Sequence, residues 1–133
     1  GWQKANMVSY MEKENIKNVK FYGHVQNPTD FLKKSIIFIS IQQNNNYPSQ
    51  SLLEAMACEN AIIASDVGET RKIVTENEGI LVNLDANDIA IAIHKLLDNQ
   101  NLRVKLGKNA RQKAMHEHNI DKYLEYFYSL ENY

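Results

Sequence analysis

The sequence predicts an α/β fold, a three-layer doubly wound Rossmann-like domain with a parallel sheet. Short strand-like runs alternate along the chain with stretches of helical periodicity. Two of the runs, IIFISI at residues 36–41 and AIIAS at residues 61–65, are apolar almost throughout, as burial on both faces of a parallel sheet requires. Parallel strands also need crossover connections, which are usually helices and nearly always right-handed.

Four runs are predicted as strands. The first is NVKFY at residues 18–22, which is rich in β-branched and aromatic side chains and ends at Gly23. The two buried runs at residues 36–41 and 61–65 follow, and GILV at residues 79–82 is a fourth, weaker case. Together these runs predict a single parallel sheet.

Helices are predicted between and after the strands. Residues 27–30 (NPTD) supply cap and first-turn chemistry for a helix at residues 31–34, and small hydroxyl residues precede a second helix that begins near Leu52. Asp85 or Asn87 would cap a later helix whose apolar residues form one stripe, and the final helix carries an aromatic face. These later helices are predicted at residues 69–77, 85–98, 101–117 and 119–130.

Length and charge describe one ordinary domain. A chain of 133 residues is near the commonest domain size, and its 15 basic and 16 acidic residues give a net charge of −1. Proteins that follow a nucleic-acid backbone concentrate Lys and Arg on one face of a basic domain. The basic residues here are spread along the chain, so we expect no nucleic-acid partner.

Metal sites and membrane spans are not expected either. A single cysteine, Cys58, cannot form an internal disulfide, which fits a reducing cytosol, and the four histidines show no zinc-ligand spacing. No apolar run approaches the roughly 20 residues that cross a bilayer. We therefore expect a cytoplasmic protein without a bound metal.

Function in a doubly wound domain depends on the loops that leave the carboxyl ends of the strands. Three loops are predicted there, at residues 23–28, 42–50 and 66–70. The middle loop is unusual, because a run of Gln and Asn ends in YPSQS and passes directly into the strong helix LLEAMAC.

The start of that helix predicts a phosphate site. A helix N-terminus preceded by proline and small hydroxyl residues offers free backbone N–H groups and the positive end of the helix dipole. Glu54, one turn inside the helix, could accept hydrogen bonds from a vicinal diol such as ribose, or it could simply be an acid that the dipole favours. The chain has neither G-x-G-x-x-G nor G-x-x-x-x-G-K-[ST], so neither the dinucleotide fingerprint nor the P-loop explains this phosphate site. We expect no cofactor.

These segments together resemble the C-terminal domain of family 4 glycosyltransferases, which have the GT-B fold. The resemblance covers residues 18–133 and rests on NVKFYGHV, DFLKKSIIFISI, NYPSQSLLEAMACENAIIASDVGETRKIV and GILVN in this order, followed by an aromatic helix. LLEAMAC followed by an apolar strand and SDVGE is its most specific part. The resemblance implies that the domain binds a nucleoside-diphosphate sugar and that Glu54, as the second acid of a Glu-x7-Glu motif, binds the ribose hydroxyls.

The first acid of that motif is missing. Asn46 stands eight residues before Glu54, and Pro48 is one residue further from Glu54 than is common in the family, which indicates an extra residue in the loop. The family's first acid contacts hydroxyls of the transferred sugar, so the resemblance implies either that Asn45 or Asn46 replaces it or that the site is altered. An amide can hydrogen-bond to hydroxyls, but it brings no negative charge to an oxocarbenium-like transition state.

The resemblance implies further donor contacts around this loop. Backbone groups at the helix start would meet the diphosphate, and residues 22–25 would border the nucleobase. Simpler alternatives stay open: Gly23 as a turn residue, His24 as a surface histidine and Tyr47 as loop packing. The candidate donor-binding residues are Gly23, His24, Val25, Asn45, Asn46, Tyr47, Ser49, Gln50, Ser51, Leu52 and Glu54.

The same resemblance implies that the intact protein transfers a sugar to an acceptor hydroxyl with retained configuration, in polysaccharide or glycolipid synthesis. The catalytic Arg and Lys, the first strand and helix, and the acceptor domain would all precede residue 1, so we expect a domain truncated at its N-terminus. Alone, it should show no transfer and at most weak nucleotide binding. We also expect peripheral membrane association of the intact protein, and a dimer through the aromatic helix at residues 119–130.

Three alternatives stay open. A nucleotide-sugar epimerase would use a similar nucleotide-binding half, and a non-catalytic partner subunit would explain the missing acid. A doubly wound signalling domain is the third, but it would need an acidic cluster at the strand ends, where Asp66 is the single acid.

Overall fold

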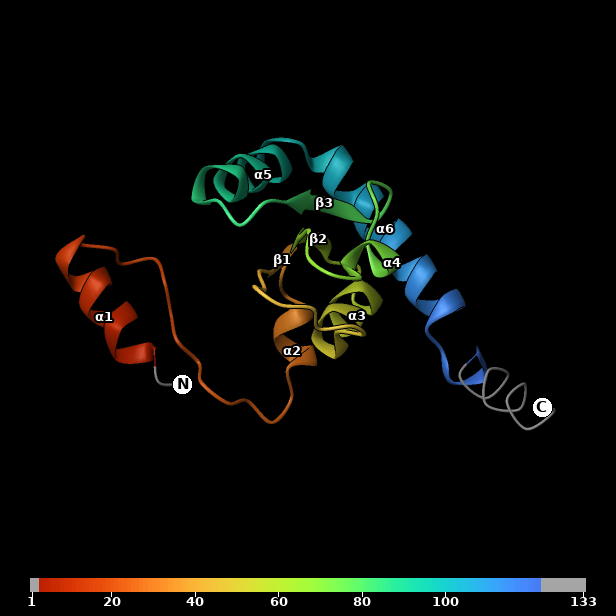
Figure 1. Cartoon of the computed structure of the whole chain (residues 1–133), viewed down its shortest axis with the longest axis horizontal. Helices are drawn as coiled ribbons and strands as arrows, with labels where there is room; N and C mark the ends of the chain where they lie inside the picture. The colour runs from red at the N-terminus through yellow and green to blue at the C-terminus, as the bar shows by residue number, and fades with distance from the viewer. Residues whose placement is uncertain (1–2, 123–133) are drawn as a thin grey trace.

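The structure of the chain, a computed structural model, describes residues 3–122 (Figure 1). Its strands form one parallel sheet in the order β1-β2-β3, and helices lie on both faces. The predicted fold class, a three-layer α/β domain on a parallel sheet, is therefore confirmed. The elements in chain order are α1 (Lys4–Lys13), α2 (Thr29–Leu32), β1 (Ile37–Ser40), α3 (Gln50–Ala57), β2 (Ala61–Ser65), α4 (Thr70–Ile73), β3 (Gly79–Val82), α5 (Ala86–Asp98) and α6 (Gln100–Glu117).

The middle strand, β2, organises the sheet. It pairs in parallel with both neighbours, so that Ile63 lies opposite Ile39 of β1 and Ile80 of β3. All five β2 residues are buried, which explains why this run has no polar face. Gly79 begins β3 where the strands approach closely, since a Cβ there would lie 2.6 Å from the carbonyl oxygen of Ile62.

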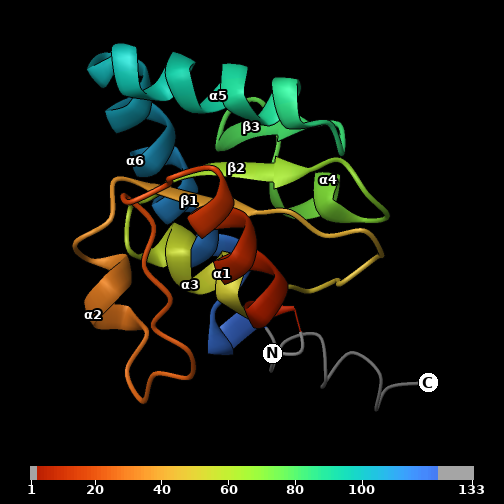
Figure 2. The same ribbon diagram turned by 90° about the vertical axis from the view of Figure 1, so that its left-hand side faces the viewer.

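Each face of the sheet has its own apolar core. Because side chains alternate along a strand, Ile62 packs with α2, α3 and the end of α6, whereas Ile63 packs with α5 and the start of α6. Figure 2 shows α5 and α3 on opposite sides of the strands. Helix α6 reaches both faces by passing the amino end of β2, where Gly107 lies against the Glu59 backbone. The carboxyl ends of the strands are thereby left to loops.

Most predicted elements are confirmed, with small shifts of their boundaries. The runs at residues 36–41, 61–65 and 79–82 contain β1, β2 and β3, and the predicted helices at 85–98 and 101–117 are α5 and α6. The Asp85 side chain caps α5, as predicted, by accepting the backbone N–H groups of Asn87 and Asp88. The predicted aromatic helix lies outside the described residues from residue 123 onward.

The strand predicted at residues 18–22 is wrong. This segment follows an irregular path between α1 and α2, and its Val19 and Phe21 side chains are exposed. In the described part of the chain β1 is an edge strand of the sheet, and residues 18–22 form no ladder with its open edge. Tyr22 instead packs edge-on against Phe31 of α2, with ring centroids 4.7 Å apart.

The two short predicted helices also differ from the structure. The one expected at residues 31–34 is α2, which begins earlier because the backbone is already helical at Pro28 (φ −63°, ψ −25°). The one expected at residues 69–77 is α4, which ends at Ile73. It ends there because the Glu78 carboxylate accepts both the backbone N–H and the hydroxyl of Thr75, each at 2.9 Å, and turns the chain toward β3.

Helix α1 was not predicted. None of its residues is buried, so no apolar stripe directed at a core marked it in the sequence. It stands apart from the layered body and is joined to it by the segment that precedes α2 (Figure 1).

Candidate functional site

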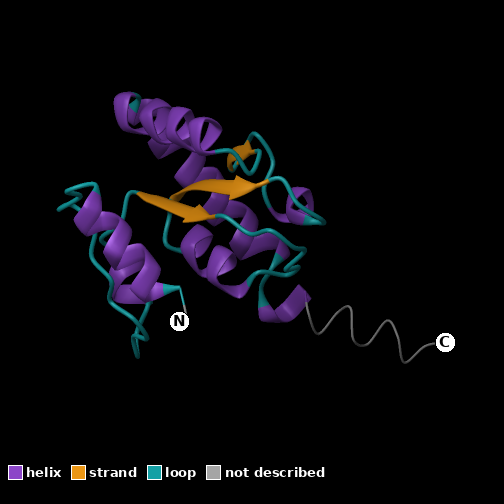
Figure 3. Cartoon of the chain, turned by 60° about the vertical axis from the view of Figure 1, so that its left-hand side comes forward, coloured by secondary structure: helices purple, strands orange, loops and turns teal. Residues whose placement is uncertain are grey.

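A small polar cavity lies at the carboxyl edge of the sheet, where Figure 3 shows loops leaving the ends of two neighbouring strands on the same side. Its walls come from the ends of β1 and β2, the loop between β1 and α3, the start of α3, and α4. It encloses about 10 Å³, room for about one water molecule. The lining residues are Ser40, Gln42, Asn46, Tyr47, Ser49, Leu52, Ala64, Ser65, Thr70 and Ile73.

The start of α3 has free backbone donors beside this cavity. Ser49 is the N-cap and is buried, and its hydroxyl lies 3.5 Å from that of Ser51 instead of capping a backbone N–H. The backbone N–H groups of residues 50–52 have no acceptor among the described residues, whereas the N–H of Leu53 bonds to the Ser49 carbonyl at 3.1 Å. Three donors and the positive end of the helix dipole are therefore available at this edge.

The loop between β1 and α3 is fastened to the last residue of β2 and to the segment that follows β2. Ser65 is buried, and its hydroxyl accepts the backbone N–H of Gln42 at 2.8 Å and donates to the Gln42 carbonyl at 2.9 Å. Further along, the backbone N–H of Glu69 donates to the side-chain oxygen of Asn45 at 3.2 Å. The conformation of the loop therefore depends on a segment more than twenty residues away in sequence.

Two ion pairs border the loop. Arg71 pairs with Asp66, and Lys72 pairs with Glu69. The Lys72 ammonium also lies 5.4 Å from the centre of the Tyr47 ring, within the range of a cation–π contact. The hydrogen bond to Glu69 raises the pKa of Lys72 above its usual value.

The structure brings part of the predicted donor site together. Asn46, Tyr47, Ser49 and Leu52 all line the cavity. Glu54 lies further along α3; it is half-buried and is not part of the cavity wall, and its carboxylate makes no hydrogen bond or ion pair with any described residue.

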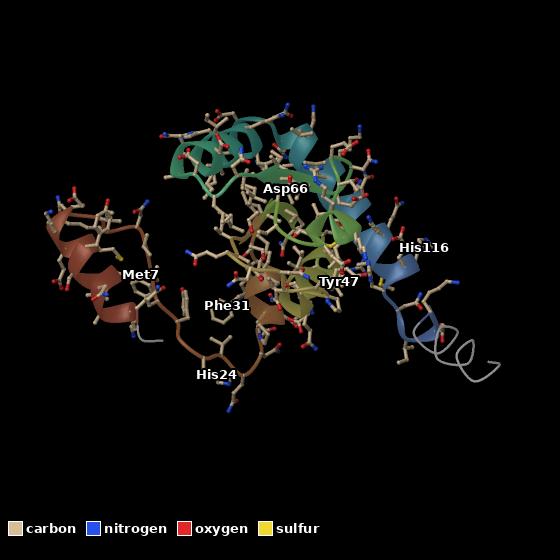
Figure 4. The ribbon with its side chains drawn as sticks, viewed as in Figure 1. Met7, His24, Phe31, Tyr47, Asp66 and His116 are labelled. Carbon is tan, nitrogen blue, oxygen red and sulfur yellow. The ribbon has the colours of Figure 1, made fainter. Side chains whose placement is uncertain are left out.

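Three predicted residues lie elsewhere. Gly23, His24 and Val25 belong to the segment between α1 and α2, and none of them lines the cavity. Figure 4 shows His24 well separated from Tyr47. Gly23 has a φ of +68°, a left-handed conformation that glycine adopts most easily.

Several cavity residues were missed from sequence. Ser40 and Ser65 are the last residues of β1 and β2, and Thr70 is the first of α4. A signal was available, because a polar residue that ends an apolar strand stands where ligands of doubly wound sheets bind.

Other kinds of site find no support in the described part of the chain. Within residues 3–122, no group of three or more His, Cys, Asp or Glu side chains is placed to hold a metal ion. None of the helices described there is both long enough and apolar enough to pass through a bilayer.

Comparison with known proteins confirms the resemblance predicted from sequence. The family model described as "Glycosyl transferases group 1" matches residues 1–113. A poly(ribitol-phosphate) alpha-N-acetylglucosaminyltransferase of Staphylococcus aureus is 28% identical over 99% of this chain and 27% of its own length. An N,N'-diacetylbacillosaminyl-diphospho-undecaprenol alpha-1,3-N-acetylgalactosaminyltransferase of Campylobacter jejuni is 32% identical over 79% of this chain and 28% of its own length.

A solved structure shares the fold over nearly the whole chain. It is a variant of S. aureus TarM in complex with fondaparinux, alpha-GlcNAc-glycerol and UDP, with a TM-score of 0.86 and 25% identity, and the match covers 98% of this chain and 27% of that one. The chain thus spans just over a quarter of the length of these relatives.

Proposed function

We propose that this chain, which belongs to the group 1 glycosyl transferases, binds the nucleoside-diphosphate sugar from which a sugar is transferred to an acceptor hydroxyl. The observation that carries the proposal is the start of α3, where three backbone N–H groups at the carboxyl edge of a parallel sheet lack acceptors among residues 3–122. A diphosphate has the negative charge and the acceptor oxygens that such a helix end recognises. The UDP bound by TarM makes a uridine nucleotide the first ligand to test.

The donor would lie across the mouth of the cavity. A volume of about 10 Å³ is far too small for a nucleotide, so the diphosphate would rest on the N–H groups of residues 50–52 from outside. An asparagine of the preceding loop would meet the transferred sugar. Glu54 would bind the ribose hydroxyls, and its carboxylate is free to do so because no described residue pairs with it.

The complete reaction would need groups outside this chain. Because the chain spans just over a quarter of its relatives' length, we place the acceptor site, and the Arg and Lys that neutralise the departing diphosphate, in another part of a longer protein. That protein would transfer the sugar with retained configuration at a membrane surface. The isolated chain should bind the donor weakly and show no transfer.

Replacing Gln50 by proline tests the phosphate site directly. Gln50 is the first residue of α3, a position where proline is tolerated because its missing N–H has no partner within the helix. The extended backbone of Ser49 (φ −78°, ψ 107°) also suits a residue before proline. A hydrogen bond to a charged group contributes about 1.5 kcal/mol, so Gln50→Pro should weaken UDP binding about tenfold in calorimetric titration.

Uridine and a second proline variant supply the controls. Uridine lacks the diphosphate, so its binding should not change in Gln50→Pro. Ala86→Pro makes the same change at the first residue of α5, after an equally extended residue, and should leave UDP binding intact. Absence of UDP binding to the unsubstituted chain at millimolar concentrations, or equal losses in the two proline variants, would overturn the proposal.

Donor binding without catalysis is a second candidate, favoured by the amides at positions 45 and 46. An amide can hold a sugar hydroxyl but cannot stabilise developing positive charge as a carboxylate does. Glu54→Ala should lower donor affinity in either case. Asn46→Glu should raise transfer by the intact protein only if that protein is itself a catalyst.

A further inference from the structure

The loop between β1 and α3 contains two neighbouring asparagines, Asn45 and Asn46, whose side chains lie in different surroundings. Asn46 lines the cavity, whereas Asn45 does not. The side-chain oxygen of Asn45 accepts the backbone N–H of Glu69 at 3.2 Å. A Cβ built on Gly68 would lie 2.6 Å from side-chain atoms of Asn45, so this side chain rests directly on the turn that follows β2.

We propose that Asn45 is a positioning residue, which fastens the loop to the turn at residues 68–69 and leaves Asn46 as the amide that meets the transferred sugar. The part concerning the sugar rests on the proposed function. The part concerning the contact does not, because it follows from the hydrogen bond and the close approach alone.

Gly68 supports this assignment in two independent ways. Its φ is +54°, a left-handed conformation that L side chains rarely adopt. The space where its side chain would stand is occupied by Asn45. The turn therefore exposes both its N–H donor and its bare Cα surface to the asparagine.

The neighbouring contacts show why Asn45 matters for Asn46 in particular. Ser65 at the end of β2 holds the loop at Gln42, and Lys72 of α4 lies over the ring of Tyr47, so the loop is held near both of its ends. Of these contacts, the one made by Asn45 is adjacent in sequence to Asn46. Without it, the backbone that carries Asn46 would be tied only at Gln42 on its N-terminal side.

A direct ligand role for Asn45 would require it to leave this turn. Its oxygen is already engaged with Glu69, and a sugar hydroxyl could be accepted there only in competition with that N–H. Aspartate keeps an acceptor oxygen but has no N–H donor, so Asn45→Asp separates the two roles. A positioning residue is rescued by aspartate, whereas an amide that donates to a sugar is not.

The test uses the chain itself, with amide hydrogen exchange at Glu69 and titration with UDP and UDP-N-acetylglucosamine. Asn45→Ala should speed exchange of the Glu69 N–H about tenfold and weaken UDP-N-acetylglucosamine binding about fivefold. Asn45→Asp should restore both within about twofold. Asn46→Ala, the matched control, should weaken binding of the sugar nucleotide without changing exchange at Glu69.

Gly68→Ala breaks the same contact from the other side. Because both changes remove one contact, the double variant Asn45→Ala/Gly68→Ala should exchange at Glu69 no faster than about twice the rate of either single variant. Unchanged exchange in Asn45→Ala, or multiplied effects in the double variant, would overturn the contact. Loss of sugar-nucleotide affinity in Asn45→Asp with Glu69 still protected would make Asn45 a ligand and overturn the positioning role.

The proposed function fails separately. If the unsubstituted chain binds neither nucleotide while exchange at Glu69 still responds to Asn45→Ala, the donor site is wrong and the fastening of the loop stands.

Discussion

Replacing Ser65 with alanine removes one oxygen atom from the end of β2 and two hydrogen bonds with it. The hydroxyl accepts the Gln42 N–H at 2.8 Å and donates to the Gln42 carbonyl at 2.9 Å, and the residue is only 2% exposed, so water cannot easily take its place. Each such bond contributes about 1 kcal/mol net, and an unpaired buried group costs roughly 1–3 kcal/mol. We expect Ser65→Ala to lower the free energy of unfolding by about 2 kcal/mol.

Urea denaturation followed by circular dichroism measures this loss. With an m-value of about 2 kcal/mol per molar urea, the midpoint should fall by about 1 M. Ser35→Ala is the matched control, because its hydroxyl makes a single exposed hydrogen bond, to the Phe31 carbonyl at 2.8 Å, and its loss should cost less than about 1 kcal/mol. Equal midpoints for Ser65→Ala and the unsubstituted chain would refute the idea that Ser65 holds the start of the loop.

Two further predictions concern stability. Asn60→Ala should lower the free energy of unfolding by about 2 kcal/mol in the same urea assay, because the buried Asn60 amide donates to the carbonyls of Leu32 at 2.9 Å and Ser35 at 2.6 Å. Asn60→Asp should lower it further, because a carboxylate can donate to neither carbonyl. A smaller loss for the aspartate variant would contradict this reasoning. Burial lowers the pKa of His118, so the unfolded chain takes up its proton more readily, and stability is full above about pH 6.5 and falls as the pH drops below that value. In thermal unfolding from pH 5 to 8, His118→Gln should reduce the dependence of stability on pH, whereas His116→Gln, which changes an exposed histidine, should leave that dependence unchanged. The same pH dependence in the two variants would refute the assignment.

The parts of the fold that could be predicted are those whose signals are local. The run at residues 61–65 is apolar at nearly every position because it is buried on both faces, and that pattern is visible without knowledge of its neighbours. Residues 18–22 have equally suitable side chains, but a strand also needs a hydrogen-bonded partner, and these residues pair with none of the described strands. Helix α1 lacked a signal for the opposite reason, since it packs no residue into the core.

The candidate site likewise contains features that could be predicted from a local sequence signal and contacts that could not. The donors at the start of α3 follow from Ser49 and the helix after it, which stand together in the sequence. The contacts that shape the preceding loop come from Ser65 and from the backbone of residues 68–69, which reach it only because β1 and β2 are neighbours in parallel register. No local pattern could therefore have shown which of Asn45 and Asn46 is turned toward the cavity.

The proposed site would recognise the two parts of the donor in different ways, the diphosphate through backbone groups and the sugar through a side chain. Backbone N–H groups at the start of α3 depend on helix geometry, so they would hold a diphosphate whatever side chains residues 50–52 carry. Recognition of the sugar would instead depend on the side chain at position 46 and on the turn that fixes its loop. An asparagine in place of an acid would consequently alter the choice of sugar and the stabilisation of positive charge, while the grip on the diphosphate stays intact.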